Sequence, residues 1–304
     1  MRAIKIPEDY KYIAVFLTMR CNLNCSFCLN SIDKNIDFNR LKFKEIGGQE
    51  WVNALNRIQT RSDIPISFCG GEPFLHKDFI HIINYLKPEL NIDILTNLNW
   101  GESNIRKFIQ EIEPERIKRN TPYPSIRVSY HPEEMGDGES LIKNVKLLQD
   151  AGFNIGIESV MYPHPNQIEA IEQMAIKCRN NGISFRPKSF TGVYSGTDDI
   201  GRPFSILHGN YSKYPGCTLN NELKSSLCKT SEFILGPDGN VYRCHRDLFS
   251  EEFPIGNITN PNFELQDIFR SCNKYGQCHP CDVKVKTNYK QELGHTSVEI
   301  KEIS

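Results

Sequence analysis

Residues 10 to 28 read "YKYIAVFLTMRCNLNCSFC" and join an apolar run directly to three closely spaced cysteines. The run at 12–18 is short and almost continuously apolar, which predicts a buried strand. Cys21, Cys25 and Cys28 follow at spacings of four and three residues. An odd number of thiols does not pair into disulfides, and a closed zinc site usually takes four ligands from two C-x₂-C pairs. Three thiolates on a [4Fe–4S] cluster leave one iron without a protein ligand, and such an iron is open to chemistry.

Five similar apolar runs follow along the first two thirds of the chain. They are residues 65–69, 91–97, 125–130, 154–162 and 183–190. Between them apolar residues recur with the helical period, for example Trp51, Leu55 and Ile58. Strand and helix alternating six times predicts parallel strands joined by right-handed crossovers and covered by helices. The predicted fold class is therefore α/β, a partial (β/α)6 barrel similar to a TIM barrel, in which ligands bind at the carboxyl ends of the strands.

Polar side chains follow these predicted strands at the edge that the cysteines occupy. After the second run comes the turn formed by Gly70, Gly71, Glu72 and Pro73. The third run ends on Thr96 and Asn97, and the fourth ends near Ser129. Glycines let the backbone come close to a ligand, and an anionic Glu72 is suited to bind a positive amino group. We expect these residues to gather around one ligand.

The alternation of strand-like and helix-like segments stops after about residue 200. The segment "SEFILGPDGNVYRC", residues 231–244, has two strand-like runs around a Gly-Pro-Asp-Gly-Asn turn, which predicts a β-hairpin. We further predict a short helix within residues 263–272 and a charged, loosely ordered tail after Thr287. The predicted domains are a barrel core at 1–200 and a small C-terminal domain of hairpin and helix at 201–304.

The bulk composition limits the partners and the compartment. A formal net charge of −1 gives no reason to expect nucleic acid. The apolar run at residues 13–17 is too short for a signal peptide or a membrane span, so we expect no membrane partner. Without an export signal, the eleven cysteines are expected in the reducing cytoplasm, where clustered cysteines indicate metal or redox chemistry.

The spacing in "CNLNCSFC" resembles the motif of the radical S-adenosylmethionine (AdoMet) enzymes, and the resemblance extends over roughly residues 12 to 190. It implies that Cys21, Cys25 and Cys28 bind a [4Fe–4S] cluster whose fourth iron takes the amino and carboxylate groups of AdoMet. Phe27 would pack on the adenine. The resemblance also places AdoMet against the turn after the second strand and against the polar strand ends, namely Gly70, Gly71, Glu72, Pro73, Thr96, Asn97 and Ser129.

Other interpretations of these residues stay open at the level of sequence. The three cysteines could form a structural zinc site that takes a fourth ligand such as His76, or hold no metal. His131, Arg186 and Lys188 either contact substrate or form a solvated rim. Two isolated cysteines, Cys69 and Cys178, are expected to be small buried residues.

The C-terminal cysteines resemble the auxiliary-cluster domains called SPASM and twitch. Cys228, ten residues, Gly239, four residues and Cys244 form the hairpin signature, and a C-x₂-C pair follows. The resemblance is closest to the smaller twitch type and implies one auxiliary [4Fe–4S] cluster held by Cys228, Cys244, Cys278 and Cys281. Cys217 and Cys272 remain as alternative ligands, a thiol near the substrate, or core residues. A zinc ribbon fits the same spacings.

The resemblance implies an enzyme in which the cluster cleaves AdoMet reductively to a 5′-deoxyadenosyl radical that takes hydrogen from a substrate carbon. An external donor of the flavodoxin or ferredoxin type would supply electrons, and an auxiliary cluster could make the net reaction an oxidation. A non-catalytic iron–sulfur or zinc module is the alternative of another class, and it predicts no AdoMet binding.

The length of chain before the first strand bears on the substrate. Relatives that modify peptides often carry an N-terminal peptide-recognition domain, and only about eleven residues precede the first predicted strand here. We therefore expect a small polar metabolite such as a sugar, a nucleotide or an aminoglycoside-like molecule, with peptide modification as the alternative.

Overall fold

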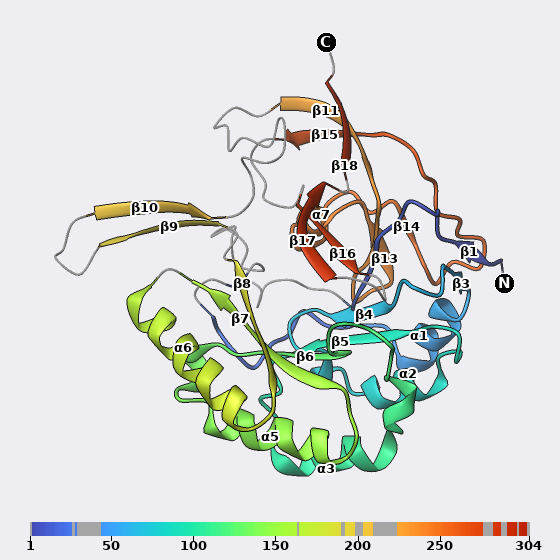
Figure 1. The fold of residues 1–304 in the computed structure, drawn as a ribbon. Helices are drawn as coiled ribbons and strands as arrows, with labels where there is room; N and C mark the ends of the chain where they lie inside the picture. Colours follow the sequence, from blue (N-terminus) through green and yellow to red (C-terminus); the bar gives the residue numbers. More distant parts are fainter. Residues whose placement is uncertain are drawn as a thin grey trace.

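A nine-stranded, mostly parallel sheet forms the centre of the molecule (Figure 1). The structure is a computed structural model that describes residues 2–25, 28, 44–162, 164–189, 192–197, 203–208, 224–275, 282–286, 291–296 and 298–302. Six central strands run in chain order and in parallel: β2 (Tyr12–Phe16), β4 (Ile66–Cys69), β5 (Ile92–Thr96), β6 (Ile126–Ser129), β7 (Ile155–Met161) and β8 (Ser184–Ser189). Each lies within one of the predicted runs, so the α/β fold class is confirmed. Among the described residues, β8 is the last strand of the sheet on this side.

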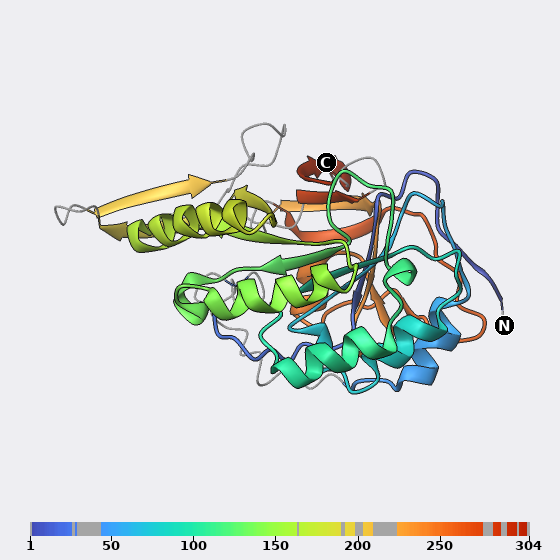
Figure 2. The same cartoon turned by 60° about the horizontal axis from the view of Figure 1, so that its bottom comes forward.

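Helices cover one face of this sheet, as Figures 1 and 2 show from two sides. They are α1 (Gly48–Leu55), α2 (Phe79–Tyr85), α3 (Glu102–Glu111), α4 (Pro132–Met135), α5 (Glu139–Asp150) and α6 (Pro165–Asn180), with the 3₁₀ turns η3 (Pro73–Leu75) and η4 (Pro114–Arg116). Alternate strand residues such as Val15, Phe68 and Ile94 pack with the helices in one large apolar core. Burying each such side chain contributes about 1.5–3 kcal/mol, so this layer holds the sheet and orients its carboxyl ends.

The opposite, concave face divides into two parts. Towards β2 it is apolar, with Tyr12 and Phe16 in a second cluster beside Ile234 and Leu248. Towards β5 and β6 it becomes charged, since Asp93 forms buried ion pairs with Arg119 and with Arg127, the latter at 2.9 Å. Buried arginines persist only with such a partner. The concave face is therefore apolar on one side and strongly polar on the other.

The predicted hairpin is present and extends the central sheet. It consists of β12 (Glu232–Leu235) and β13 (Asn240–Tyr242), and β14 (Gly256–Asn257) pairs with β13. Gly239 in its turn has φ +78°, a conformation that glycine adopts without strain. β12 pairs in parallel with β2, so C-terminal residues complete the sheet at the strand that precedes the cysteines. A domain boundary at residue 200 stays a prediction.

The remaining described elements are short. The pairs are β1 (Ile4–Lys5) with β3 (Ile58–Gln59), β9 (Gly192–Thr197) with β10 (Pro203–His208), and β16 (Asp282–Lys286) with β17 (Gln291–Thr296). A three-stranded sheet of order β15-β11-β18 is formed by β11 (Lys224–Thr230), β15 (Arg270–Tyr275) and β18 (Val298–Glu302), near the C-terminal end in Figure 1. One C-terminal helix, α7 (His245–Phe249), follows the hairpin. Within the described ranges, no helix is long and apolar enough to cross a bilayer.

Three local predictions are wrong. Residues 263–272 form no helix: 263–269 have no regular structure and β15 begins at 270. Phe263 packs into the core, and the Arg57 guanidinium binds the carbonyl oxygens of residues 258, 260 and 261 just before it, at 2.8–3.1 Å. The tail after Thr287 contains β17 and β18, because β18 finds a hydrogen-bonding partner in β11. Ile58 lies in β3 and outside α1.

Candidate functional site

The three cysteines follow β2 at the carboxyl edge of the sheet. Cys21 is exposed, Cys25 and Cys28 are half-buried, and none is in a disulfide. The Cys28 amide donates to the Cys25 carbonyl at 3.1 Å, which closes a turn between them. Partial burial raises the pKa of the Cys21 and Cys25 thiols, and the negative charges of Cys28 and Glu133 raise that of Cys25 further. Phe27 lies outside the described residues.

The turn after β4 packs directly on the backbone that leads to these cysteines. The Gly71 amide donates to the Thr18 carbonyl at 3.1 Å, and the Glu72 amide donates to the Arg20 carbonyl at 2.7 Å. A Cβ on Gly70 would lie 2.4 Å from the Thr18 carbonyl oxygen, and one on Gly71 would lie 2.1 Å from that of Arg20. The glycines therefore permit two loops to touch, where the sequence suggested close approach to a ligand.

Glu72 is fully buried, and its partners belong to the end of β5 and to the turn after β4. Its carboxylate accepts hydrogen bonds from the Thr96 hydroxyl at 2.7 Å, the Asn97 amide at 2.7 Å and the Phe74 amide at 3.3 Å. Burial nevertheless raises the pKa of Glu72 to about 7, since it disfavours the charged form more than these hydrogen bonds favour it. In this conformation Glu72 joins β4 to the end of β5, and its binding of an amino group stays a prediction.

The loop after β5 reaches the cysteines through Asn97. Its Nδ2 donates to the Asn22 side-chain oxygen at 2.8 Å and lies 3.7 Å from the Cys21 sulfur. Asn22 in turn donates to the Asn99 carbonyl at 2.7 Å. Asn97 is therefore brought to Cys21 and Thr96 to Glu72, and their role in binding AdoMet stays a prediction.

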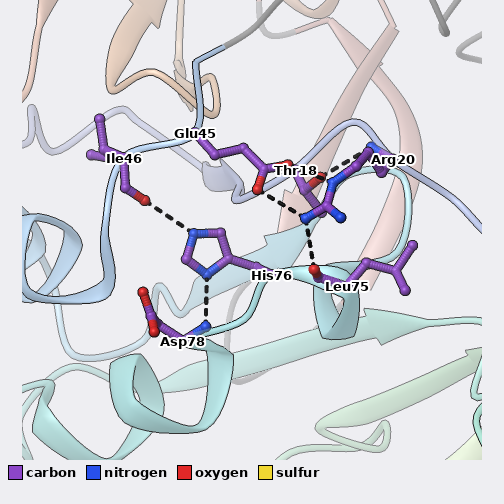
Figure 3. A network of polar contacts seen from close by, with 7 residues as sticks. All are labelled: Thr18, Arg20, Glu45, Ile46, Leu75, His76 and Asp78. Atoms are coloured by element: carbon purple, nitrogen blue, oxygen red, sulfur yellow. Dashed lines mark hydrogen bonds and ion pairs between the residues drawn. The ribbon is translucent and has the colours of Figure 1, made fainter.

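A second network holds both ends of the segment that carries the cysteines (Figure 3). Arg20 donates from Nε and Nη2 to the two carboxylate oxygens of Glu45, each at 2.9 Å, and from Nη2 to the Leu75 carbonyl at 2.8 Å. The Thr18 hydroxyl also donates to Glu45. Residues 18–20 precede the cysteines and Glu45 follows them, so these bonds close the segment. Sequence reasoning missed Arg20 and Glu45. Arg20 stands beside the motif, whereas nothing marks Glu45.

His76 is part of the same network and is not a metal ligand in this arrangement. Its Nδ1 accepts from the Asp78 amide at 3.3 Å, which requires the proton to be on Nε2, and Nε2 donates to the Ile46 carbonyl at 3.0 Å (Figure 3). Both ring nitrogens are thus engaged. To complete a zinc site, His76 would have to give up one of these two hydrogen bonds.

The polar residues at the ends of β6 and β8 differ in exposure and in partners. Ser129 is half-buried at the end of β6. His131 is also half-buried, and burial lowers its pKa to about 4. Arg186 is exposed on β8, and Lys188 forms an ion pair with Glu158 at 2.5 Å.

The structure also describes the two isolated cysteines and three of the cysteines in the C-terminal region. Cys69 and Cys178 are buried, as predicted. Cys228 on β11 and Cys272 on β15 are buried side by side, and Cys244 directly precedes α7. Cys217, Cys278 and Cys281 lie outside the described residues, so the predicted ligand set is seen only in part.

The chemistry of the donor set fits an iron–sulfur cluster. Three partly accessible thiols, none of them in a disulfide, lie on one loop next to buried polar strand ends. Each cysteine of a [4Fe–4S] cluster binds a different iron, so three thiolates on one loop can serve a single cluster. Cys21, Cys25 and Cys28 are therefore suited to hold the cluster.

Comparison with known proteins defines the class. A family model described as the radical SAM superfamily matches residues 15–175, from β2 into α6, which is more than half of the chain. The chain belongs to the radical SAM superfamily. Members of this superfamily are enzymes, and the matched domain implies a [4Fe–4S] cluster and AdoMet.

Individual relatives are distant. Over 283 residues the chain is 23% identical to a GTP 3′,8-cyclase of Nautilia profundicola, covering 89% of this chain and 78% of the cyclase. Over 87 residues it is 30% identical to an S-adenosylmethionine-dependent nucleotide dehydratase of Selenomonas ruminantium, covering 28% of this chain and 29% of the dehydratase. The crystal structure of Streptococcus suis SuiB bound to precursor peptide SuiA is similar with a TM-score of 0.52 at 14% identity, covering 86% of this chain and 64% of SuiB. The chain thus spans less than two thirds of the dehydratase and of SuiB, and the likeness to SuiB concerns the fold alone.

Proposed function

We propose that the chain cleaves AdoMet reductively and abstracts hydrogen from a carbon of a small polar metabolite. The observation that carries this proposal is the contact of three strand-end loops. The cysteine loop, the turn at Gly70–Pro73 and the loop at Asn97 are joined by direct hydrogen bonds at one edge of the sheet. When bound, the cluster supplies one electron that splits AdoMet into methionine and a 5′-deoxyadenosyl radical, and this radical takes a hydrogen atom from the substrate.

The residues of the site have separate tasks in this proposal. Cys21, Cys25 and Cys28 hold the cluster, and the Arg20–Glu45 pair keeps their loop closed. The polar strand ends around Glu72 and Asn97 bind AdoMet. Positioning of the substrate carbon and exclusion of water are what the protein must add, since the cofactors carry the difficult step.

The charges on the concave face support a polar substrate. In the parallel register, Ser129, Glu158 and Arg186 are opposite one another on β6, β7 and β8 and so point to one face, and Lys188 lies on the same face of β8. Arg186 is exposed there, and the Lys188–Glu158 pair is mostly but not fully enclosed. An exposed guanidinium beside a mostly enclosed ion pair provides hydrogen bonds that an apolar substrate would leave unsatisfied.

The names of two relatives narrow the substrate class. The dehydratase and the cyclase both act on nucleotides by their printed names. A nucleotide presents phosphate oxygens that an arginine binds in bidentate fashion. Of the small polar metabolites we therefore favour a nucleotide.

The proposal includes an auxiliary centre, an electron donor and a compartment. An auxiliary [4Fe–4S] cluster in the C-terminal region would accept an electron from the substrate radical, which makes the net reaction an oxidation. A flavodoxin or ferredoxin would reduce the radical-generating cluster. A reducing cytoplasm suits eleven cysteines, and none of the eight that the structure describes forms a disulfide.

Anaerobic reconstitution tests the reaction. The holoprotein is incubated with AdoMet and dithionite, and 5′-deoxyadenosine is quantified against a variant in which Cys21, Cys25 and Cys28 are alanine. We expect product from the wild type alone. An intact cluster that yields no 5′-deoxyadenosine with any reductant would refute the reaction and favour the non-catalytic module.

Deuterium transfer tests the substrate class. Deuterated nucleotides are compared with deuterated peptides, and the label is sought in 5′-deoxyadenosine. We expect label from a nucleotide, and a lower yield in Arg186→Ala. Label transferred from peptides only would replace the small metabolite with a peptide substrate.

A further inference from the structure

Three cysteines of the C-terminal region lie around one buried arginine. Cys228 and Cys272 are both more than nine-tenths buried, and Cys244 is half-buried at the start of α7. Arg243, itself 7% exposed, lies close enough to all three sulfurs and to Asp247 for negative charge on them to raise its pKa. The hairpin signature of the sequence accounts for Cys228 and Cys244 but leaves Cys272 unassigned.

The strand register brings Cys272 onto the face of Cys228. Cys272 of β15 pairs with Ser226 of β11, and Cys228 follows two residues later on the same side of that strand. The buried pattern agrees, since Ser226, Cys228 and Cys272 are enclosed while Ser271 and Asn273 are exposed. The Cys228 and Cys272 thiols are close enough to form a hydrogen bond, and they form no disulfide.

Polar contacts hold Cys244 and Cys272 near each other from opposite sides. Arg243 donates to the Ser271 carbonyl, next to Cys272, and forms an ion pair with Asp247 at 2.7 Å. Asp247 is within hydrogen-bonding reach of Cys244. The arginine thus links the end of the hairpin to β15.

The chemistry of these three thiols suits iron–sulfur ligation. Thiolates that bind iron would add negative charge beside the Arg243–Asp247 ion pair, and the Arg243 guanidinium would partly offset that charge. Reduction potentials of such clusters respond to nearby charge, so Arg243 would also tune this centre.

We propose that Cys272 is a ligand of the auxiliary iron–sulfur cluster, together with Cys228 and Cys244. These three thiols are three of the four thiolates that such a cluster takes. This inference rests on the auxiliary cluster of the proposed function and concerns which thiols bind it.

The test removes the first cluster so that only auxiliary iron is counted. In a background with Cys21, Cys25 and Cys28 replaced by alanine, the full chain is reconstituted anaerobically, and iron, sulfide and zinc per chain are measured. We expect about four irons, the content of one [4Fe–4S] cluster. Adding Cys272→Ala to this background should remove most of this iron. The iron that remains should give a different EPR spectrum when it is reduced.

Two matched variants separate ligation from packing. Ser226→Ala alters the buried residue that pairs directly with Cys272, and Cys178→Ala removes a buried cysteine on α6. Both should keep the iron and the EPR spectrum of the background, with circular dichroism confirming the fold of every variant.

The outcomes are distinct. Unchanged iron and an unchanged spectrum in Cys272→Ala would overturn this inference alone, as would an equal loss of iron in Ser226→Ala. A background protein that binds no iron, or zinc in its place, would overturn the auxiliary cluster as well. Neither result would bear on AdoMet cleavage, which the wild-type assay measures separately.

Discussion

At the scale of single residues, Glu72 shows how one buried carboxylate connects several elements. It begins the turn η3 and accepts hydrogen bonds from Thr96 and Asn97 at the end of β5. A buried carboxylate is costly when charged, and its three donors only partly offset that cost. The site therefore contains a group whose protonation changes near neutral pH.

The pKa of Glu72 predicts how stability depends on pH. Its folded-state pKa of about 7 lies above the ordinary value of 4.5, so the folded state holds the proton more tightly. The stabilisation is fully present below about pH 4.5 and is lost as pH rises through 7, a change of about 3 kcal/mol in the free energy of unfolding. Glu72→Gln should remove this dependence, which denaturant titrations of the cluster-free protein at pH 5, 6 and 7.5 would measure.

The control for this prediction is Glu102→Gln, which changes an exposed carboxylate on α3. It should keep the wild-type dependence between pH 5 and 7.5. Equal slopes in wild type and Glu72→Gln would show that another group is responsible.

At the scale of elements, the site depends on how closely two loops approach. The turn after β4 lies against the backbone of residues 18–20, and Gly70 and Gly71 leave no room there for a Cβ. Arg20 and Glu45 then close the cysteine loop from its two ends. The geometry of the cysteines is thus set by contacts between loops that belong to different strands.

Replacing Gly71 by alanine should separate these loops. The new Cβ would lie 2.1 Å from the Arg20 carbonyl oxygen, so the backbone has to shift, at a cost of about 1–3 kcal/mol in stability. We expect Gly71→Ala to lose most of its AdoMet binding and the iron held by Cys21, Cys25 and Cys28, as measured by equilibrium dialysis and iron analysis.

Gly101→Ala is the matched control, since a Cβ there meets only the Ser103 hydroxyl oxygen at 3.8 Å. It should bind AdoMet and iron like the wild type. If Gly71→Ala does so too, the close contact of the loops is not needed for binding.

At the scale of the whole molecule, residues from both ends of the chain build one sheet. β12 pairs with β2, and Ile234 and Leu248 cover Tyr12 and Phe16 on the concave face. The strand that leads to the cysteines is therefore an interior strand only because C-terminal residues lie beside it. An unpaired apolar edge would favour aggregation.

A chain cut after residue 200 should fold poorly for this reason. It would expose the edge of β2 and the apolar half of the concave face, so we expect a low soluble yield and strong binding of a hydrophobic dye. A chain cut after residue 286 keeps β12 and β13 and loses β17 and β18, so it should stay soluble and bind the dye only weakly. Soluble, natively folded 1–200 would instead support an independent barrel domain ending there.

The sequence by itself determined the six parallel strands, the hairpin, the cysteine motif and the class of enzyme. These rest on local signals, since the period of apolar residues and the spacing of ligands are read within a few positions of each other. Only the tertiary structure decided that Glu45 and Arg20 close the loop, that both nitrogens of His76 are engaged, and that Cys272 lies beside Cys228. Arg57 likewise binds the carbonyl oxygens before residues 263–269, where the local pattern favoured a helix. Apart from the bond between His76 and Asp78, these contacts join residues 25 to more than 200 positions apart. No pattern along the chain records which distant partner a polar group finds once the core has packed.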